Sequence, residues 1–113
     1  MKKYKPTLLI DLDGVLNTYN GSFKEDYIPP IKDGARDFLD NICKNYKLIL
    51  FTTRDKQLAK QWTKTCNLDK YFIDITNVKI PAYLIIDDRC VCFRGNYDIL
   101  LKDINNFVVW HKK

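Results

Sequence analysis

Three apolar runs in the chain are each followed at once by polar side chains that can do chemistry. A short apolar run without alternation predicts a strand that is buried on both faces of a sheet. Open parallel sheets bind ligands beyond the carboxyl ends of their strands. We therefore expect the residues after the three runs to meet in one site. They are Asp11 and Asp13, then Thr52 and Thr53, then Asp87 and Asp88.

The carboxylates in this set predict a cation site. If Asp11, Asp87 and Asp88 lie together, two like charges about 4 Å apart repel by about 4 kcal/mol at an effective dielectric of 20. Such a cluster either takes up protons or binds a cation. Hard oxygen ligands beside an anionic substrate suit Mg²⁺. Lys79 lies on the approach to the third apolar run and is the candidate to balance the remaining charge.

The elements that must position these residues follow from the hydrophobic pattern. Strands are expected at residues 7–10, 47–52 and 81–86, with a shorter one at 71–75 and a last one at 107–110. Apolar strands that alternate with amphipathic helices predict βαβ units and a parallel sheet. The fold class is therefore α/β, a three-layer Rossmannoid domain with a central, mainly parallel sheet.

Helices are expected in three places. Pro29-Pro30 can open the first, because proline suits the first turn of a helix. A second starts near Asp55, and a third covers Tyr97 to Asn105. The polar stretch from Asn17 to Ile28 has no clean period and predicts a loop or small hairpin. The first helix places its apolar residues on one stripe: Ile31, Ala35, Phe38, Leu39, Ile42 and Cys43.

Length and composition restrict the classes of protein. A chain of 113 residues predicts one domain over 1–113, and 46% apolar residues with 29% charged exclude a disordered or collagen-like chain. No run reaches the roughly 18 apolar residues of a membrane span. The basic start precedes only three apolar residues, so no signal peptide is expected and the predicted location is cytoplasmic.

Charge and cysteine content add two weaker expectations. The net charge of +5 favours anionic partners, nucleic acid among them, but a lysine-rich surface explains it slightly better than a dedicated nucleic-acid patch. Much of the excess lies at the ends, in Lys2, Lys3, Lys5, Lys112 and Lys113. The four cysteines contain no CxxC pair, which favours ordinary packed thiols over a redox or metal role. They are Cys43, Cys66, Cys90 and Cys92.

Four segments together resemble the haloacid dehalogenase-like (HAD) hydrolase superfamily, most of whose members are phosphatases. The first is Asp11-Leu12-Asp13-Gly14-Val15-Leu16, which matches the first motif of the family. Thr52 resembles the second motif, Lys79 the third, and Asp87-Asp88 the fourth. The resemblance covers residues 7 to about 90, and the order of the motifs makes it stronger than any one of them.

The resemblance implies a role for each residue. Asp11 would be the nucleophile that forms an aspartyl-phosphate, and Asp13 the general acid and base. Gly14 would allow the turn after the strand. The phosphoryl oxygens would be held by Thr52, by its rival Thr53, and by Lys79. The Mg²⁺ ligands would be Asp11, the Asp13 backbone carbonyl, Asp87 and, directly or through water, Asp88.

Several of these residues have a structural alternative. Thr52 can be the N-cap of the following helix, and Lys79 can be merely solvated. Asp88 can pair with an arginine. The substrate-anion candidates are Arg54, Arg89 and Arg94, which can equally be surface residues.

The spacing of the motifs leaves no room for a cap domain. About 38 residues separate Asp13 from Thr52, and 26 separate Thr52 from Lys79, and the expected elements use them. We predict a capless Mg²⁺-dependent phosphomonoesterase with an open site, a phosphorylated and even macromolecular substrate, and a monomeric or weakly homo-oligomeric state. The alternatives are a phosphatase of nucleic-acid ends and a catalytically silent HAD-like binding module.

Overall fold

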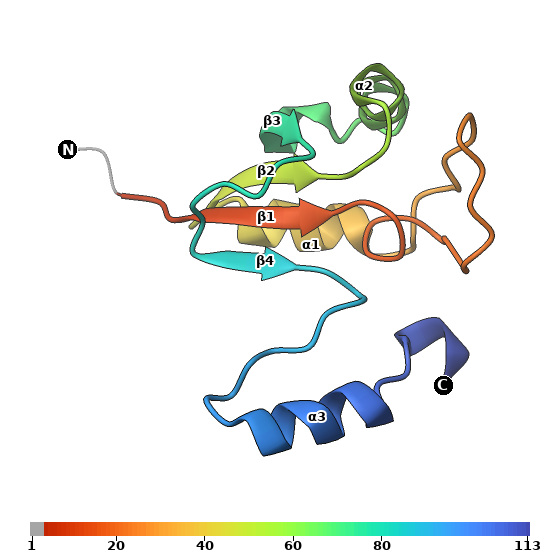
Figure 1. Ribbon diagram of the computed structural model, residues 1–113. Coiled ribbons are helices and arrows are strands. Elements are labelled where there is room, and N and C mark those ends of the chain that lie inside the picture. Colours follow the sequence, from red (N-terminus) through yellow and green to blue (C-terminus); the bar gives the residue numbers. More distant parts are fainter. Residues whose placement is uncertain (1–3) are drawn as a thin grey trace.

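A four-stranded parallel sheet forms the centre of the computed structural model, which describes residues 4–113 (Figure 1). Lys2 and Lys3, named above for the excess of positive charge, lie outside the described residues. The sheet order is β3-β2-β1-β4, and the predicted α/β class is confirmed, a Rossmann-like three-layer fold without a cap domain. The strands are β1 (Thr7–Asp11), β2 (Lys47–Phe51), β3 (Phe72–Thr76) and β4 (Leu84–Ile86).

Three α-helices and two short 3-10 helices connect or follow the strands. The predicted start of the second α-helix is confirmed, because the Asp55 carboxylate accepts a hydrogen bond from the Leu58 N–H at 3.0 Å and caps the helix. The helices are α1 (Ala35–Ile42), α2 (Lys56–Thr65), η1 (Asp69–Tyr71), α3 (Tyr97–Asn106) and η2 (Trp110–Lys112).

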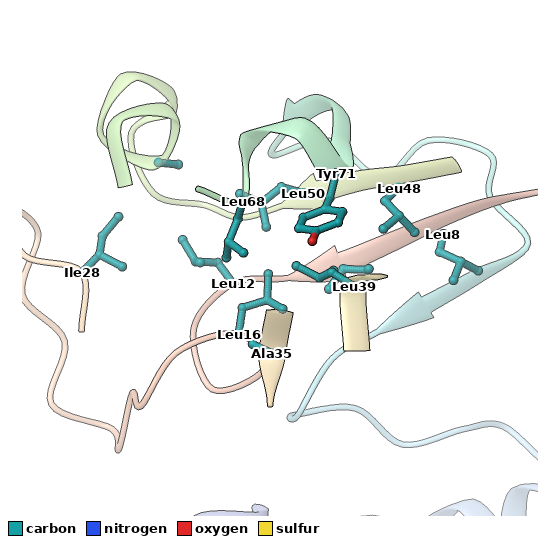
Figure 2. Packing of buried hydrophobic residues seen from close by; sticks show 12 residues of the cluster. Leu8, Leu12, Leu16, Ile28, Ala35, Leu39, Leu48, Leu50, Leu68 and Tyr71 are labelled. Carbon is teal, nitrogen blue, oxygen red and sulfur yellow. The ribbon is translucent and has the colours of Figure 1, made fainter. Parts of the chain in front are cut away.

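The hydrophobic core lies between one face of the sheet and the first two α-helices. Alternate residues of β1 and β2 point to this face, because side chains alternate along a strand. Helix α1 supplies Ala35 and Leu39, and α2 supplies Ala59. Figure 2 shows ten labelled side chains of this cluster: Leu8, Leu12, Leu16, Ile28, Ala35, Leu39, Leu48, Leu50, Leu68 and Tyr71. This packing fixes β1 and β2, whose ends carry the site.

The first helix begins later than the sequence predicts. Pro29-Pro30 does not open it, because Ile31 forms an isolated β-bridge with Asn17 and holds that segment extended. Helix α1 starts only after Gly34, whose φ of 88° lies in the left-handed region that favours glycine. The segment from Asn17 to Ile28 is a loop, as expected, with one further bridge from Lys24 to Tyr27.

The carboxyl-terminal part differs most from the prediction. Strand β4 is short, and Leu84 is 53% exposed rather than buried on both faces. Residues 107–110 do not form a strand: Phe107 and Val109 are extended but unpaired, and Trp110 begins η2. Helix α3 is present as predicted, yet none of its residues is buried, and Figure 1 shows it away from the sheet.

Two smaller expectations can be compared with residues 4–113. The four cysteines are free, and Cys43 and Cys66 are half-buried as packed thiols should be, but Cys90 and Cys92 are exposed. These two cysteines lie in the connector between β4 and α3. Within the described chain, no helix has both the length and the apolar content to cross a bilayer.

Candidate active site

The register of the sheet brings the predicted residues to one edge. Ile10 pairs with Leu50 on one side and with Ile86 on the other. Asp11 is the last residue of β1, and Thr52 and Asp87 directly follow β2 and β4. The three side chains therefore start from neighbouring positions at the carboxyl edge, where open α/β sheets bind ligands.

Three carboxylates converge at this edge. Oxygen atoms of Asp11, Asp87 and Asp88 lie within 4.8 Å of one another. Burial, followed by the charges of Asp87 and Asp88, raises the pKa of Asp11 from 3.8 to about 7. Burial and a hydrogen bond shared with Asp87 also raise the pKa of Asp88. Each shift arises because negative charge is confined here without a neutralising partner, which a bound cation would supply.

Asp88 fits this reading of the cluster. Its Oδ2 atom is buried and has no hydrogen-bond partner among the described residues. A buried polar atom is normally satisfied, so an orphaned carboxylate oxygen beside two other carboxylates suits a metal ion. The alternative ion pair of Asp88 with an arginine is not found among the described residues, and Arg54 pairs with Asp13 instead.

Gly14 makes room for the Asp88 carboxylate. Its φ is 83°, and a Cβ atom added there would lie 2.1 Å from Asp88 Oδ2. The position therefore requires glycine for two reasons: the backbone is left-handed, and there is no space for a Cβ atom. This observation supports the role that the sequence assigned to Gly14 as a turn residue, and adds close contact with the last carboxylate of the cluster.

Asp13 is held apart from the three converging carboxylates. Its Oδ2 accepts a hydrogen bond from Arg54 Nε at 2.7 Å, and its Oδ1 accepts one from Asn17 Nδ2 at 3.0 Å. The side chain is 19% exposed, so it is fixed at the rim of the site. As a metal ligand, Asp13 thus retains only its backbone carbonyl, because both oxygens of its carboxylate accept hydrogen bonds from Arg54 and Asn17.

The two threonines after β2 lie beside Asp11 at the same cavity. Thr52 is buried, and its Oγ1 accepts a hydrogen bond from the Arg54 N–H at 3.2 Å. It is not the N-cap of α2, because Asp55 has that position. Thr53 is exposed, and both threonines line the same cavity as Asp11.

That cavity has a volume of about 290 Å³ and opens to solvent. The loop between Asn17 and Ile28 contributes Tyr19 and Phe23 to its wall, and Phe23 is 57% exposed. This loop therefore forms one wall of the site, and we call it the flap. The lining residues are Asp11, Asp13, Tyr19, Phe23, Phe51, Thr52, Thr53, Asp87, Asp88 and Arg89.

The predicted basic residues separate into three groups. Arg89 lines the cavity, and Arg54 is buried beside Asp13 rather than on the surface. Arg94 is instead held by Asp103, with contacts of 2.9 and 3.1 Å. Lys79 is exposed in the crossover from β3 to β4 and is not among the cavity's lining residues. The structure therefore does not bring Lys79 or Arg94 to the site.

Sequence reasoning missed two residues that shape the site. Asn17 is fully buried; it donates to Asp13, and its Oδ1 accepts hydrogen bonds from the Gly14 and Tyr19 N–H groups. Trp110 Nε1 donates to the Gly14 carbonyl at 2.8 Å. Asn17 could have been suspected, since asparagine commonly bonds nearby loop backbone. Nothing local signals the contact of Trp110, which is 96 residues away.

The neighbouring His111 also reaches this region through the same turn. Its charge lowers the pKa of Asp88, against the stronger effect of burial. The chain's carboxyl-terminal turn η2 thus lies beside the loop that follows β1.

Comparison with known proteins identifies the fold and not a family. No family model and no curated protein matches the chain. One solved structure is similar, described as the structure of a conserved protein coded by a locus from Bacteroides thetaiotaomicron. The two share 21% sequence identity and a TM-score of 0.61, over 90% of this chain and 91% of that one. Identity at this level supports the shared fold alone.

Proposed function

We propose that this protein is a Mg²⁺-dependent phosphomonoesterase of the HAD-like type. The observation that carries the proposal is the convergence of Asp11, Asp87 and Asp88 beside a separately held Asp13. The three converging carboxylates suit a cation, and in this proposal Asp13 transfers the proton. Phosphoryl transfer needs such positioning and charge stabilisation more than any other contribution from a protein.

Asp11 is the nucleophile in this proposal. Its carboxylate oxygen attacks phosphorus, a new O–P bond forms, and the bond from phosphorus to the leaving oxygen breaks. The nucleophile must be ionised, and a pKa of about 7 leaves much of it protonated near neutral pH. A cation at the cluster would lower that pKa and keep the attacking oxygen charged.

Asp13 moves the proton in both halves of the reaction. It gives its proton to the leaving oxygen as the ester bond breaks. As a carboxylate it then takes a proton from water, which attacks the aspartyl-phosphate and releases inorganic phosphate. Its hydrogen bonds to Arg54 and Asn17 hold the carboxylate at the rim of the cavity, where a leaving group would lie.

The residues present fit a magnesium ion. Asp11, Asp87 and Asp88 would hold it through carboxylate oxygens, and the Asp13 backbone carbonyl could add a ligand. When bound, Mg²⁺ supplies charge neutralisation at the phosphoryl oxygens. The hydroxyl groups of Thr52 and Thr53 would bind the same oxygens, while Arg54 Nη2, buried without a partner among the described residues, offers a further donor.

The substrate class follows from the open cavity. A cap domain encloses a small substrate and reads its leaving group, and this fold has none. Flap residues and Arg89 are the available contacts for the body of the substrate. A nucleic-acid end remains the second candidate because the chain carries a net charge of +5 and Arg89 lies at the cavity.

A phosphate-release assay tests the proposal. Wild type, Asp11→Asn and the control Asp37→Asn, an exposed carboxylate of α1, are compared with and without Mg²⁺. The panel is an aryl phosphate, a sugar phosphate, a phosphopeptide and a phosphorylated oligonucleotide. Loss of a covalent nucleophile commonly lowers turnover by several orders of magnitude, so about a thousandfold loss is expected for Asp11→Asn alone.

The assay also separates the alternatives. No turnover on any substrate, with Mg²⁺ bound, supports the silent binding module. A preference for the oligonucleotide that falls steeply with salt supports the nucleic-acid phosphatase, because counterion release drives such binding. Wild-type activity of Asp11→Asn, or full activity in excess chelator, contradicts the proposed mechanism.

A further inference from the structure

The outer edge of the sheet presents an exposed apolar strand. Strand β4 is the last in the order and pairs only with β1 among the described residues. Tyr83, Leu84 and Ile85 are 63%, 53% and 37% exposed. An exposed apolar edge strand is a template for association with another chain unless charge or another element covers it. Among the helices of the described residues, α3 follows β4 in the chain but lies away from the sheet and does not cover this edge (Figure 1).

Helix α3 presents a second uncovered apolar surface. Tyr97, Leu101 and Ile104 lie on one stripe of the helix at spacings of four and three residues, and each is more than half exposed. Asp98 and Lys102 each directly follow a stripe residue and lie about 100° further around the helix, outside the stripe. A helix gains most of its stability by burying such a stripe against other elements. Figure 1 shows α3 projecting away from the sheet on an extended connector.

Both ends of this projecting arm are held to the body of the same chain. It begins at Asp87, directly after β4, and ends where Trp110 Nε1 donates to the Gly14 carbonyl. Its exposed Arg94 is already paired with Asp103 within the arm. The arm is therefore fixed at both ends, and the apolar stripe of α3 is exposed to solvent. The stripe contains no charged residue, so it does not need a partner of opposite charge.

The area exposed by the chain exceeds what a monomer of this size needs. A folded monomer of 13.4 kDa is expected to expose about 6,500 Å². This chain exposes 8113 Å². A standard interface removes roughly 800 Å² from each partner, so the excess of about 1,600 Å² is ample for one. The radius of gyration of 15.2 Å, against about 13 Å for a compact domain, agrees with that excess.

We propose that a second copy of this chain covers the surface formed by β4 and α3, in a symmetric dimer. Both surfaces are apolar, and the same chain carries them. In a two-fold arrangement, α3 of one copy packs against β4 of the other, and the same contact forms twice. The second copy would thereby cover β4, the edge of the sheet that α3 of the same chain leaves exposed.

Sedimentation velocity over about a hundredfold range of concentration tests this, because dimers dissociate by mass action. The expected mass is twice 13.4 kDa at the upper end. Leu101→Glu and Leu84→Lys place charges on exposed positions and should weaken the dimer at least about tenfold. Lys102→Glu changes an exposed position of α3 outside the stripe and should leave the dimer intact. Circular dichroism verifies that each variant folds.

Hydrogen exchange supplies an independent readout. Amides of β4 and α3 in the wild type should exchange more slowly as concentration rises, and those of α2 should not change. A monomer at every concentration overturns the proposal. So does slow exchange of the α3 amides that does not depend on concentration, because α3 then packs on the sheet of its own chain. A dimer that Lys102→Glu weakens as much as Leu101→Glu also overturns it.

Discussion

Arg54 and Asp13 form the most enclosed ion pair of the described chain. Arg54 Nε lies 2.7 Å from Asp13 Oδ2, and the arginine side chain is only 1% exposed. Arg54 Nη1 also donates to the Lys24 carbonyl, and the guanidinium lies 4.7 Å from the centre of the Phe23 ring. One residue thus connects the proposed general acid to the flap beside the cavity.

Removing that connection should destabilise the fold. Arg54→Met keeps the apolar stem but deletes two hydrogen bonds of the guanidinium and its contact with the Phe23 ring, and should lower the free energy of unfolding by about 1–3 kcal/mol. Arg94→Met removes the exposed pair with Asp103 and should change it by about 0.5 kcal/mol or less. Urea unfolding at neutral pH measures both. An equal decrease in the free energy of unfolding for both variants would show that burial of the Arg54–Asp13 pair adds nothing to stability.

The sheet and the edge of the site were predictable from local pattern. The runs before Asp11 and Thr52 are continuous and apolar, and parallel pairing then places the ends of neighbouring strands together. Asp55 is a standard capping residue, so the start of α2 could also be predicted. Each of these features depends on a few adjacent residues.

The remaining features depend on tertiary contacts that no local pattern records. Residues 107–110 have the composition of a strand but find no strand to pair with in the described chain. Lys79 misses the cavity because the β3–β4 crossover carries it away from the site. Gly34 delays α1, and Trp110 reaches Gly14 across 96 positions of sequence.

Protonation of Asp11 should make the metal-free protein less stable as pH rises. The pKa of Asp11 is about 7 in the folded chain and near 3.8 when unfolded, so the folded state binds more protons between these values. The free energy of unfolding therefore falls through that window because of this group. Asp11→Asn removes the ionisation, and the variant should lose less stability than wild type from about pH 4 to 8.

Thermal denaturation in chelator at a series of pH values measures this difference. Asp37→Asn, an exposed carboxylate of α1, should follow the wild-type curve. Parallel curves for wild type and Asp11→Asn would show that burial and the neighbouring charges do not hold a proton on Asp11.

Mg²⁺ should stabilise the folded chain through the acidic cluster. A ligand that binds only the folded state adds about 2.7 kcal/mol at one hundred times its dissociation constant, which raises the melting temperature by several degrees. Asp87→Ala removes a ligand from the cluster and should abolish that rise. Asp98→Ala, on exposed α3, should retain it. If Asp88→Ala abolishes the rise and Asp87→Ala does not, Asp88 is the direct ligand.

Gly14→Ala should impair this metal response through a steric effect alone. The added methyl group would lie 2.1 Å from Asp88 Oδ2 and 2.8 Å from Asp88 Cγ, so the carboxylate must move out of the cluster. Gly21→Ala is the matched control, because Gly21 also has a positive φ, 104°, but has nothing within 4 Å of the added atom. Backbone strain costs of order 1–3 kcal/mol at either site.

The two variants therefore separate strain from displacement of Asp88. Both should melt below wild type in chelator, and Gly14→Ala should melt lower because it carries the clash as well. With Mg²⁺ added, Gly21→Ala should recover the wild-type rise in melting temperature. Gly14→Ala should need at least about tenfold more Mg²⁺ for the same rise, since binding must first return Asp88 to the cluster. Equal Mg²⁺ titrations for both variants would mean that the position of Asp88 beside Gly14 does not matter for binding.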